Sequence, residues 1–220
     1  MVKKLGVLTG GADGPGLNAA IRAVVHRAVQ KYKMQVVGVL RGWRGLLDGL
    51  FLPLTEDSVS GILPRGGTIL RISRTNPYRH PNGHKIIQEN MRSAGIDALV
   101  VIGGNETLSV AHRLHSEEGL PLVGIPKTID NDVPGTDYSF GFDTTVNIAM
   151  EAIDRIHTTA ESHDRVMVVE VMGHHTGWIA VYAGIAGGAD VILIPELCVS
   201  IDAVCETILT RHDKGRDFSI

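Results

Sequence analysis

A seven-residue segment, Pro126–Asp132, concentrates side chains that could carry out group-transfer chemistry. Its polar members are a cation, a hydroxyl, an amide and two carboxylates: Lys127, Thr128, Asp130, Asn131 and Asp132. In phosphoryl transfer one carboxylate can take the proton of the attacking hydroxyl, a second can hold Mg²⁺, and a lysine can neutralise the transferring group. A solvated turn rich in aspartate and asparagine has the same composition, so this segment alone leaves both interpretations open.

Two glycine-rich loops, Gly10–Gly16 and Gly103–Thr107, each follow an apolar run and precede a segment of helical period. Because glycine has no Cβ, the backbone N–H groups can approach a phosphate closely, and the helix N-terminus adds a favourable dipole. Neither loop has the lysine of a Walker A motif or the GxGxxG spacing of a dinucleotide site. Since the carboxyl ends of parallel strands open onto one crevice, the loops and Pro126–Asp132 together favour a phosphate site.

Composition excludes several classes of function. The 220 residues include 21 Lys+Arg and 24 Asp+Glu, a net charge of −3, which argues against nucleic-acid binding by bulk charge. Hydrophobic residues make up 44% and charged residues 20%, which is typical of a folded globular chain. No apolar stretch approaches the roughly 18 residues of a membrane span, so we expect neither a membrane nor a nucleic acid as partner. The first residues do not have the pattern of a secretory signal and only two cysteines are present, so we expect a cytoplasmic protein.

The elements that must position these loops follow from hydrophobic periodicity. Short apolar runs alternate with helical-period segments, which predicts an α/β fold with a parallel sheet covered by helices on both faces. The predicted strands are 5–8, 36–40, 98–102, 122–125, 166–171 and 191–194, and the predicted helices are 16–31, 107–116, 143–160, 176–186 and 201–211. Residues 216–220 have the pattern of a further strand, so we expect the second half to be incomplete within these 220 residues.

In this order along the chain, the motifs resemble those of the phosphofructokinase family. The matching segments are Gly10–Arg22, Arg65–Thr68 with Ser73 and Arg74, Gly103–Thr107, Pro126–Asp132, Ser162 and His163 with Arg165, Val169–Gly173, Gly187–Ala189 and Ile194–Glu196. The resemblance implies two Rossmann-like three-layer α/β/α domains with mainly parallel sheets. Residues 1–138 would bind the phosphoryl donor, and residues 139–220 would form a sugar-phosphate domain that is incomplete at its C-terminal end.

The resemblance also implies a glycolytic reaction, the Mg²⁺-dependent transfer of a phosphoryl group to the 1-hydroxyl of fructose 6-phosphate. By this comparison Asp130 is the base, Asp132 lies near the metal with Asn105, and Thr128 and Lys127 complete the catalytic set. The donor would contact Gly11, Asp13, Arg74, Gly104, Asn105, Glu106 and Thr107. The sugar phosphate would contact Thr128, Asp130, Arg165, Glu170, Met172, Gly173 and His174. Arg165 would reach across a subunit interface, which implies a homo-oligomer, either a dimer or a tetramer.

Two residues bear on the choice of donor. ATP-using relatives have a glycine at the position of Glu106, and an acidic side chain there would repel the nucleotide α-phosphate. Lys127 stands where many ATP-using relatives have glycine, and its cation could stabilise pyrophosphate in the transition state. Both residues favour pyrophosphate. ATP stays open as the alternative donor, because a lysine at this position occurs with either donor.

Four residues depart from the family pattern: Ala12, Arg71, Asn105 and His174. The amide of Asn105 stands where an acidic residue usually contacts Mg²⁺, and His174 replaces an always-charged arginine. These departures keep open a catalytically weak regulatory relative. A kinase acting on NAD or lipids would share the Gly103–Thr107 pattern but would not account for the other matching segments.

The remaining distinctive side chains are expected to be structural. Adjacent His174 and His175 are predicted to point apart, so a zinc site is not expected. Cys198 and Cys205 are predicted to be buried thiols rather than a disulfide or metal pair. Trp43 and Trp178 are predicted to pack in or near the core.

Overall fold

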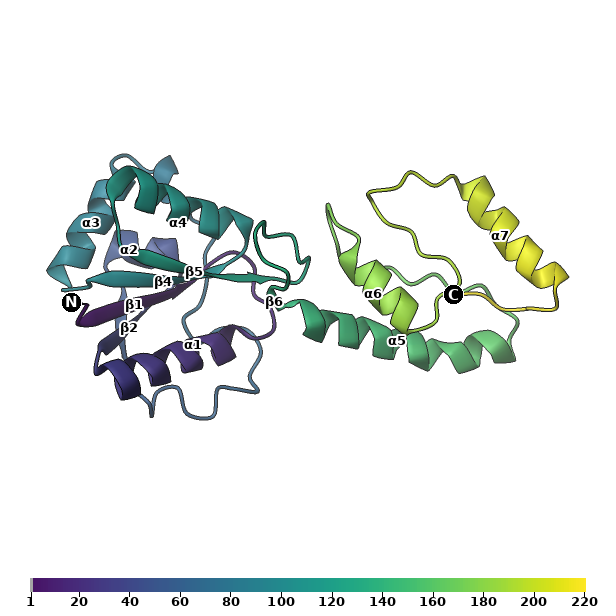
Figure 1. Cartoon of the computed structure of the whole chain (residues 1–220), viewed down its shortest axis with the longest axis horizontal. Helices are drawn as coiled ribbons and strands as arrows, with labels where there is room; N and C mark the ends of the chain where they lie inside the picture. The colour runs from purple at the N-terminus through teal and green to yellow at the C-terminus, as the bar shows by residue number, and fades with distance from the viewer. Residues whose placement is uncertain (1) are drawn as a thin grey trace. The chain divides into compact units, whose positions relative to one another are not determined.

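The computed structural model describes residues 2–220, which form two compact units (Figure 1). The first unit runs to Thr128 and also includes Val133–Gly141. The second unit consists of Ile129–Asp132 together with Phe142–Ile220. The carboxylate-bearing end of the segment Pro126–Asp132 therefore belongs to the second unit, although the strand that leads into it belongs to the first.

The first unit is built on a sheet of six strands in the order β3-β2-β1-β4-β5-β6. The strands are β1 Lys4–Thr9, β2 Gln35–Val39, β3 Phe51–Leu54, β4 Ala98–Gly103, β5 Leu122–Thr128 and β6 Phe140–Gly141. All neighbouring pairs are parallel except β2 and β3. This confirms the predicted α/β class and the four strands predicted in this half, each to within a few residues at its ends.

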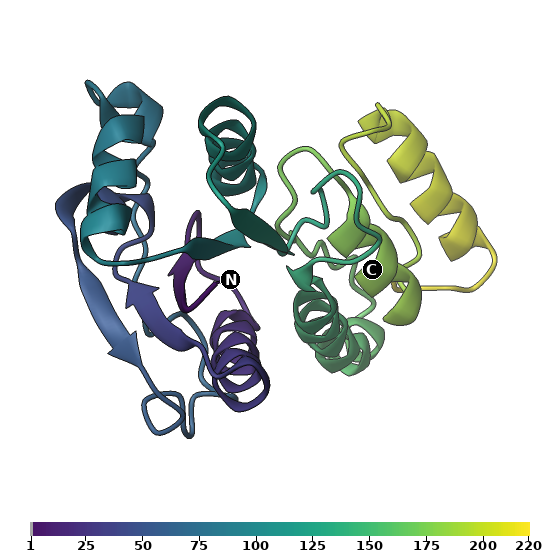
Figure 2. The same ribbon diagram turned by 60° about the vertical axis from the view of Figure 1, so that its left-hand side comes forward.

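Helices cover both faces of this sheet (Figures 1 and 2). They are α1 Leu17–His26, which continues into the π-helical turn η1 Arg27–Lys31, then α2 Trp43–Asp48, the 3₁₀ turn η2 Pro77–Arg79, α3 Gly83–Ser93 and α4 Asn105–Glu118. Side chains alternate along a strand, so Val7 joins the apolar cluster beneath α1 while Leu8 joins the cluster beneath α3 and α4. Strands β1, β2 and β4 are thus buried on both sides, which explains their continuous apolar runs.

Three elements lie in residues 41–97, where the periodicity predicts nothing: α2, β3 and α3. Helix α2 is only six residues long and is bounded by Gly42 and Gly49, both with positive φ. Strand β3 is a four-residue antiparallel edge strand that contains Pro53. Helix α2 and strand β3 are too short to show a clear apolar period. Helix α3, with 11 residues, is long enough to show one and is a helix that the prediction missed.

A buried asparagine joins α1 to the segment that leads to Arg74. Asn18 is 2% exposed, and its amide Nδ2 donates to the carbonyls of Arg65 (3.0 Å) and Gly66 (3.3 Å). Its Oδ1 accepts from the backbone N–H of Ile69 at 2.9 Å. One side chain therefore satisfies three backbone groups of a loop that has no secondary structure of its own, and fixes this loop against the start of α1.

We expect Asn18→Ala to lower the free energy of unfolding by about 1–3 kcal/mol, because it leaves buried backbone groups without partners. Urea denaturation followed by circular dichroism measures the change. Ser116→Ala is the control: the Ser116 hydroxyl donates to carbonyls within α4 on the exposed side of the helix, so its loss should cost less than about 0.5 kcal/mol. Equal costs for the two variants would contradict the prediction.

The second unit contains α5 Phe142–Ser162, α6 Trp178–Ala186 and α7 Ile201–Asp213. Ile153 on α5 and Ala183 on α6 form an apolar cluster with Ala160 and Ile220. None of the described helices in either unit has the length and apolar character needed to span a bilayer. The three helices lie where the periodicity predicts them.

The strands predicted at 166–171 and 191–194 do not form a sheet in the described residues. A strand needs a hydrogen-bonded neighbour, and both segments find one only in residues 219–220. Val166 forms an isolated parallel bridge with Ser219, and the carbonyl of Ile220 accepts from Asp190 (2.8 Å) and Val191 (3.2 Å). Val168 is therefore 92% exposed in spite of its apolar side chain.

Two expectations about buried side chains are wrong in the second unit. Cys198 and Cys205 are exposed free thiols. Cys205 lies on α7, which buries none of its residues. Trp178 is 43% exposed at the start of α6. In the first unit Trp43 is buried as predicted.

Candidate active site

The two glycine-rich loops lie side by side because β1 and β4 are adjacent and parallel. Thr9 pairs with Ile102 at the ends of these strands, and the N–H of Gly10 donates to the carbonyl of Ile102 at 2.9 Å. Thr107 packs between the loops: a Cβ on Gly10 or on Gly103 would lie 2.6 Å from its side chain. Both glycines are therefore required by close packing against Thr107, which is 4% exposed.

A cavity of about 440 Å³ opens beside these loops within the first unit. Five of the seven predicted donor-binding residues line it: Gly11, Arg74, Asn105, Glu106 and Thr107. Gly104 and Asp13 do not. Glu106 is exposed in the first turn of α4, where a helix N-terminus would otherwise favour a bound anion.

The same cavity is also lined by large side chains that no motif indicates, among them Trp43, Tyr78, Arg79 and Arg113. They come from α2, η2 and α4, three separate elements. No local spacing joins residues that far apart in sequence, so only the fold could reveal them. The cavity consequently has three guanidinium groups, those of Arg74, Arg79 and Arg113.

Lys127 lies under the first glycine loop rather than in the cavity. It is 4% exposed at the end of β5, and its Nζ donates to the carbonyl of Ala12. Burial lowers the pKa of the Lys127 ammonium, and the nearby Asp13 carboxylate opposes this by raising it. The next residue, Thr128, is held by the Ser139 hydroxyl, which donates to its carbonyl at 2.7 Å.

The two aspartates of the segment Pro126–Asp132 lie in the second unit with a pair of histidines. Burial raises the pKa of Asp130, and the like charge of Asp132 raises it further, while His174 and His175 lower it. The Thr176 hydroxyl donates to the backbone carbonyl of Asp130 at 2.8 Å, which ties the segment to the start of α6. A carboxylate with a raised pKa is suited to accept a proton.

The two histidines do not point apart as predicted. Their ring centroids are 4.1 Å apart with an interplanar angle of 66°. Gly173 turns the chain immediately before them with φ +142°, and a Cβ there would lie 2.6 Å from the carbonyl of Thr176. Within the described residues no group of three histidine, cysteine or acidic side chains is arranged to hold a metal ion.

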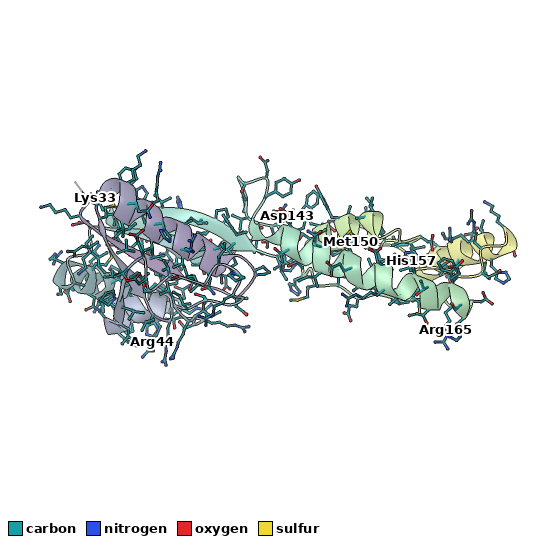
Figure 3. All side chains as sticks on the ribbon, turned by 90° about the horizontal axis from the view of Figure 1, so that it is seen from below. Lys33, Arg44, Asp143, Met150, His157 and Arg165 are labelled. Carbon is teal, nitrogen blue, oxygen red and sulfur yellow. The ribbon has the colours of Figure 1, made fainter. Side chains whose placement is uncertain are left out.

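The predicted sugar-phosphate residues that follow Asp132 all lie in the second unit and divide into two groups. Glu170, Met172 and Gly173 line a largely apolar cavity of about 490 Å³. His174 and Arg165 do not line it. Arg165 is exposed just beyond the end of α5, where its side chain extends away from the ribbon (Figure 3). Glu196, known from the sequence only as part of a motif, accepts the N–H of Gly177 at 2.8 Å and so caps α6.

Comparison with known proteins assigns the family. The profile of the family described as Phosphofructokinase matches residues 4–220. The chain belongs to the phosphofructokinase family. The fold agrees with this assignment: the structure of Pichia pastoris phosphofructokinase in the T-state aligns with a TM-score of 0.90 and 38% identity, over 99% of this chain and 25% of that one.

Curated members of the family resemble the chain under two names. "Pyrophosphate--fructose 6-phosphate 1-phosphotransferase" of Streptomyces coelicolor is 59% identical over 94% of this chain and 61% of its own length. "ATP-dependent 6-phosphofructokinase 3" of the same organism is 51% identical over 99% of this chain and 63% of its own length. The chain thus spans about three fifths of the length of these relatives, and family membership alone does not decide the donor.

The environment of Asp130 leads to a prediction about its titration. A protonated imidazole favours the carboxylate, so removing one in His175→Gln should move the pKa of Asp130, already raised, further upward. Nuclear magnetic resonance titration of the Asp130 carboxyl carbon measures this directly. His163→Gln, which removes an exposed imidazole that does not act on Asp130, should leave the titration unchanged. A lower pKa in His175→Gln would contradict the described arrangement.

Proposed function

We propose that the chain belongs to an enzyme that transfers a phosphoryl group from pyrophosphate to the 1-hydroxyl of fructose 6-phosphate, giving fructose 1,6-bisphosphate in glycolysis. The observation that carries the choice of donor is the position of Glu106 on the wall of the cavity beside the two glycine-rich loops. The 59% identity to a relative named for this reaction supports the same choice. A phosphotransferase acting on an alcohol group is the broader class.

Glu106 acts by excluding a longer donor. Its carboxylate lies in the first turn of α4, so a third phosphate group there would meet a like charge where helix N-termini normally attract anions. Pyrophosphate has no phosphate to place beyond the two that the loops hold. Lys127, buried beneath Ala12 of the first loop, supplies a fixed positive charge whose desolvation strengthens its effect on a nearby phosphate.

Asp130 is the proposed general base. As the 1-hydroxyl oxygen forms its bond to phosphorus, the hydroxyl proton passes to the Asp130 carboxylate. The bridging phosphorus–oxygen bond of pyrophosphate breaks, and its electron pair leaves with inorganic phosphate. The raised pKa of Asp130 is consistent with this role, because a stronger base takes the proton more readily. Thr128, which immediately precedes the segment of the second unit, is proposed to contact the sugar.

The remaining contacts to the sugar phosphate are proposed for Arg165, Glu170, Met172, Gly173 and His174. Three of them share a cavity, which supports a binding role for that part of the unit. Arg165 is exposed and apart from this cavity, as expected of a side chain that serves a neighbouring subunit in a homo-oligomer. Residues 1–138 are accordingly proposed as the donor domain and 139–220 as part of a second α/β domain for the sugar phosphate.

Mg²⁺ is the proposed cofactor, with Asp132 and Asn105 as its protein ligands. Both side chains offer oxygen atoms, the donor type that magnesium prefers, and magnesium commonly takes only one or two protein ligands and completes its shell with substrate phosphates and water. When bound, it would neutralise part of the charge on the donor. The free thiols Cys198 and Cys205 fit a reducing, cytoplasmic setting, which is part of the same proposal.

Two alternatives have specific support. The 51% identity to an ATP-dependent relative favours ATP as donor, and the three arginines of the cavity would also suit a nucleotide. Asn105 and His174, which replace charged residues of the family pattern, favour a catalytically weak regulatory subunit. Both alternatives are separated from the main proposal by the assay that follows.

We expect the whole protein, supplied with Mg²⁺ and fructose 6-phosphate, to form fructose 1,6-bisphosphate with pyrophosphate and at least tenfold more slowly with ATP. A coupled assay measures both rates, and Asp130→Ser is the inactive control because it removes the proton acceptor. Turnover with ATP alone would overturn the choice of donor. Binding of fructose 6-phosphate in calorimetry without turnover from either donor would instead establish the regulatory alternative.

Glu106→Gly should raise kcat/KM for ATP by at least about tenfold, because juxtaposed like charges cost several kcal/mol in binding. The ratio of the two donors' kcat/KM values is the quantity to measure, since a general loss of stability would lower both. Glu89→Gly removes an exposed glutamate from α3, away from the cavity, and should leave this ratio unchanged. An unaltered ratio in Glu106→Gly would show that this carboxylate does not select the donor.

A further inference from the structure

The donor cavity is larger than its proposed ligand requires. A volume of about 440 Å³ falls within the range of pockets that bind drug-sized molecules, roughly 300–1,000 Å³. Pyrophosphate would leave much of this space to water. Volume alone therefore does not explain how a nucleotide would be excluded from the part of the cavity beyond the phosphates.

A nucleobase in this part of the cavity would be stabilised by stacking on an aromatic ring, and Tyr78 is the residue that could provide one. Stacking on an aromatic side chain is a common means of holding a base, because every base has a π face. The other aromatic residue of the cavity, Trp43, is 3% exposed and has almost no free face. Tyr78 is half-buried, and Asn76 fixes its backbone through a hydrogen bond of 3.0 Å from the Tyr78 N–H to Oδ1.

One face of the Tyr78 ring is already covered by Arg113. The guanidinium carbon of Arg113 lies 3.7 Å from the centroid of the Tyr78 ring, and both residues line the cavity. Glu117, one helical turn further along α4, holds the guanidinium through two hydrogen bonds, from Nε at 3.0 Å and from Nη2 at 3.1 Å. A planar cation fixed by a carboxylate fork therefore occupies the place of a stacked base.

We propose that Arg113 is a second donor-specificity residue, which excludes nucleotides by covering the aromatic face of Tyr78. This proposal rests on the proposed pyrophosphate-dependent function and deepens it. Glu106 opposes the phosphate chain of a nucleotide, whereas Arg113 opposes its base. The two residues lie on the same helix seven positions apart, so one face of α4 acts against both ends of the unwanted donor.

Adenosine is the probe that separates the two effects, because it has a base but no phosphate for Glu106 to repel. Arg113→Leu should raise the affinity of the full chain for adenosine by at least about fivefold, the low end of what base–aromatic stacking contributes. Titration calorimetry or ligand-observed nuclear magnetic resonance measures the affinity without any turnover. Glu117→Gln, which keeps the guanidinium but removes its partner, should raise the affinity by a smaller factor.

Arg44→Leu is the matched control. Arg44 and Asp48 form the same kind of i, i+4 ion pair on α2, with the Arg44 side chain 48% exposed against 50% for Arg113. Neither Arg44 nor Asp48 lines the cavity. This variant should leave adenosine binding unchanged. The free energy of unfolding should fall by a similar small amount in Arg44→Leu and in Arg113→Leu.

Unchanged or weaker adenosine binding in both Arg113→Leu and Glu117→Gln would overturn the proposal, as would an equal rise in Arg44→Leu. These outcomes are distinct from failure of the proposed function. A protein that uses only ATP in the coupled assay, yet gains adenosine affinity in Arg113→Leu, would refute the pyrophosphate assignment and retain the covering role of Arg113. Pyrophosphate turnover without that gain would refute only the role of Arg113.

Discussion

The parallel pairing of β1 with β4 is the interaction on which the proposed donor site depends. It brings the two glycine-rich loops to the same edge of the sheet, and the N–H of Gly10 extends the hydrogen bonding of the strands into the first loop. The buried side chain of Thr107 then sets the distance between the loops, since neither Gly10 nor Gly103 leaves room for a Cβ. A larger residue at either glycine would move both glycine-rich loops at once.

Hydrophobic periodicity predicts the strands whose two faces are regularly buried. Strands β1, β2 and β4 are apolar because helices cover both faces, and the loops that follow them could be placed from the sequence for that reason. Contacts made by irregular segments could not be placed in this way. Tyr78 and Arg113 are in contact although they lie 35 positions apart, and Asn18 contacts the backbone of a loop that begins at Arg65. Such pairings have no period, so nothing in one sequence indicates them.

The second unit shows the opposite limit. Its apolar segments at 166–171 and 191–194 have the composition of strands. Composition gives a segment only a tendency to be extended, and a strand forms only where a neighbouring strand provides hydrogen bonds. Residues 219–220 contact both segments and are the only neighbour that the described residues offer them. The prediction that these segments form strands is therefore wrong for the described residues, although the segments are apolar. The predicted burial of Cys205 and Trp178 is also wrong, because few side chains of this unit are buried.

Every residue that lines the donor cavity belongs to the first unit, and the proposed proton acceptor belongs to the second. If the proposed function holds, substitutions on one face of α4 would exchange one phosphoryl donor for another without changing the carboxylates and histidines of the second unit. In evolutionary terms, the choice of phosphoryl donor would then change independently of the residues proposed for proton transfer. Such independence would account for relatives that are named for different donors, pyrophosphate and ATP, yet are 59% and 51% identical to the same chain.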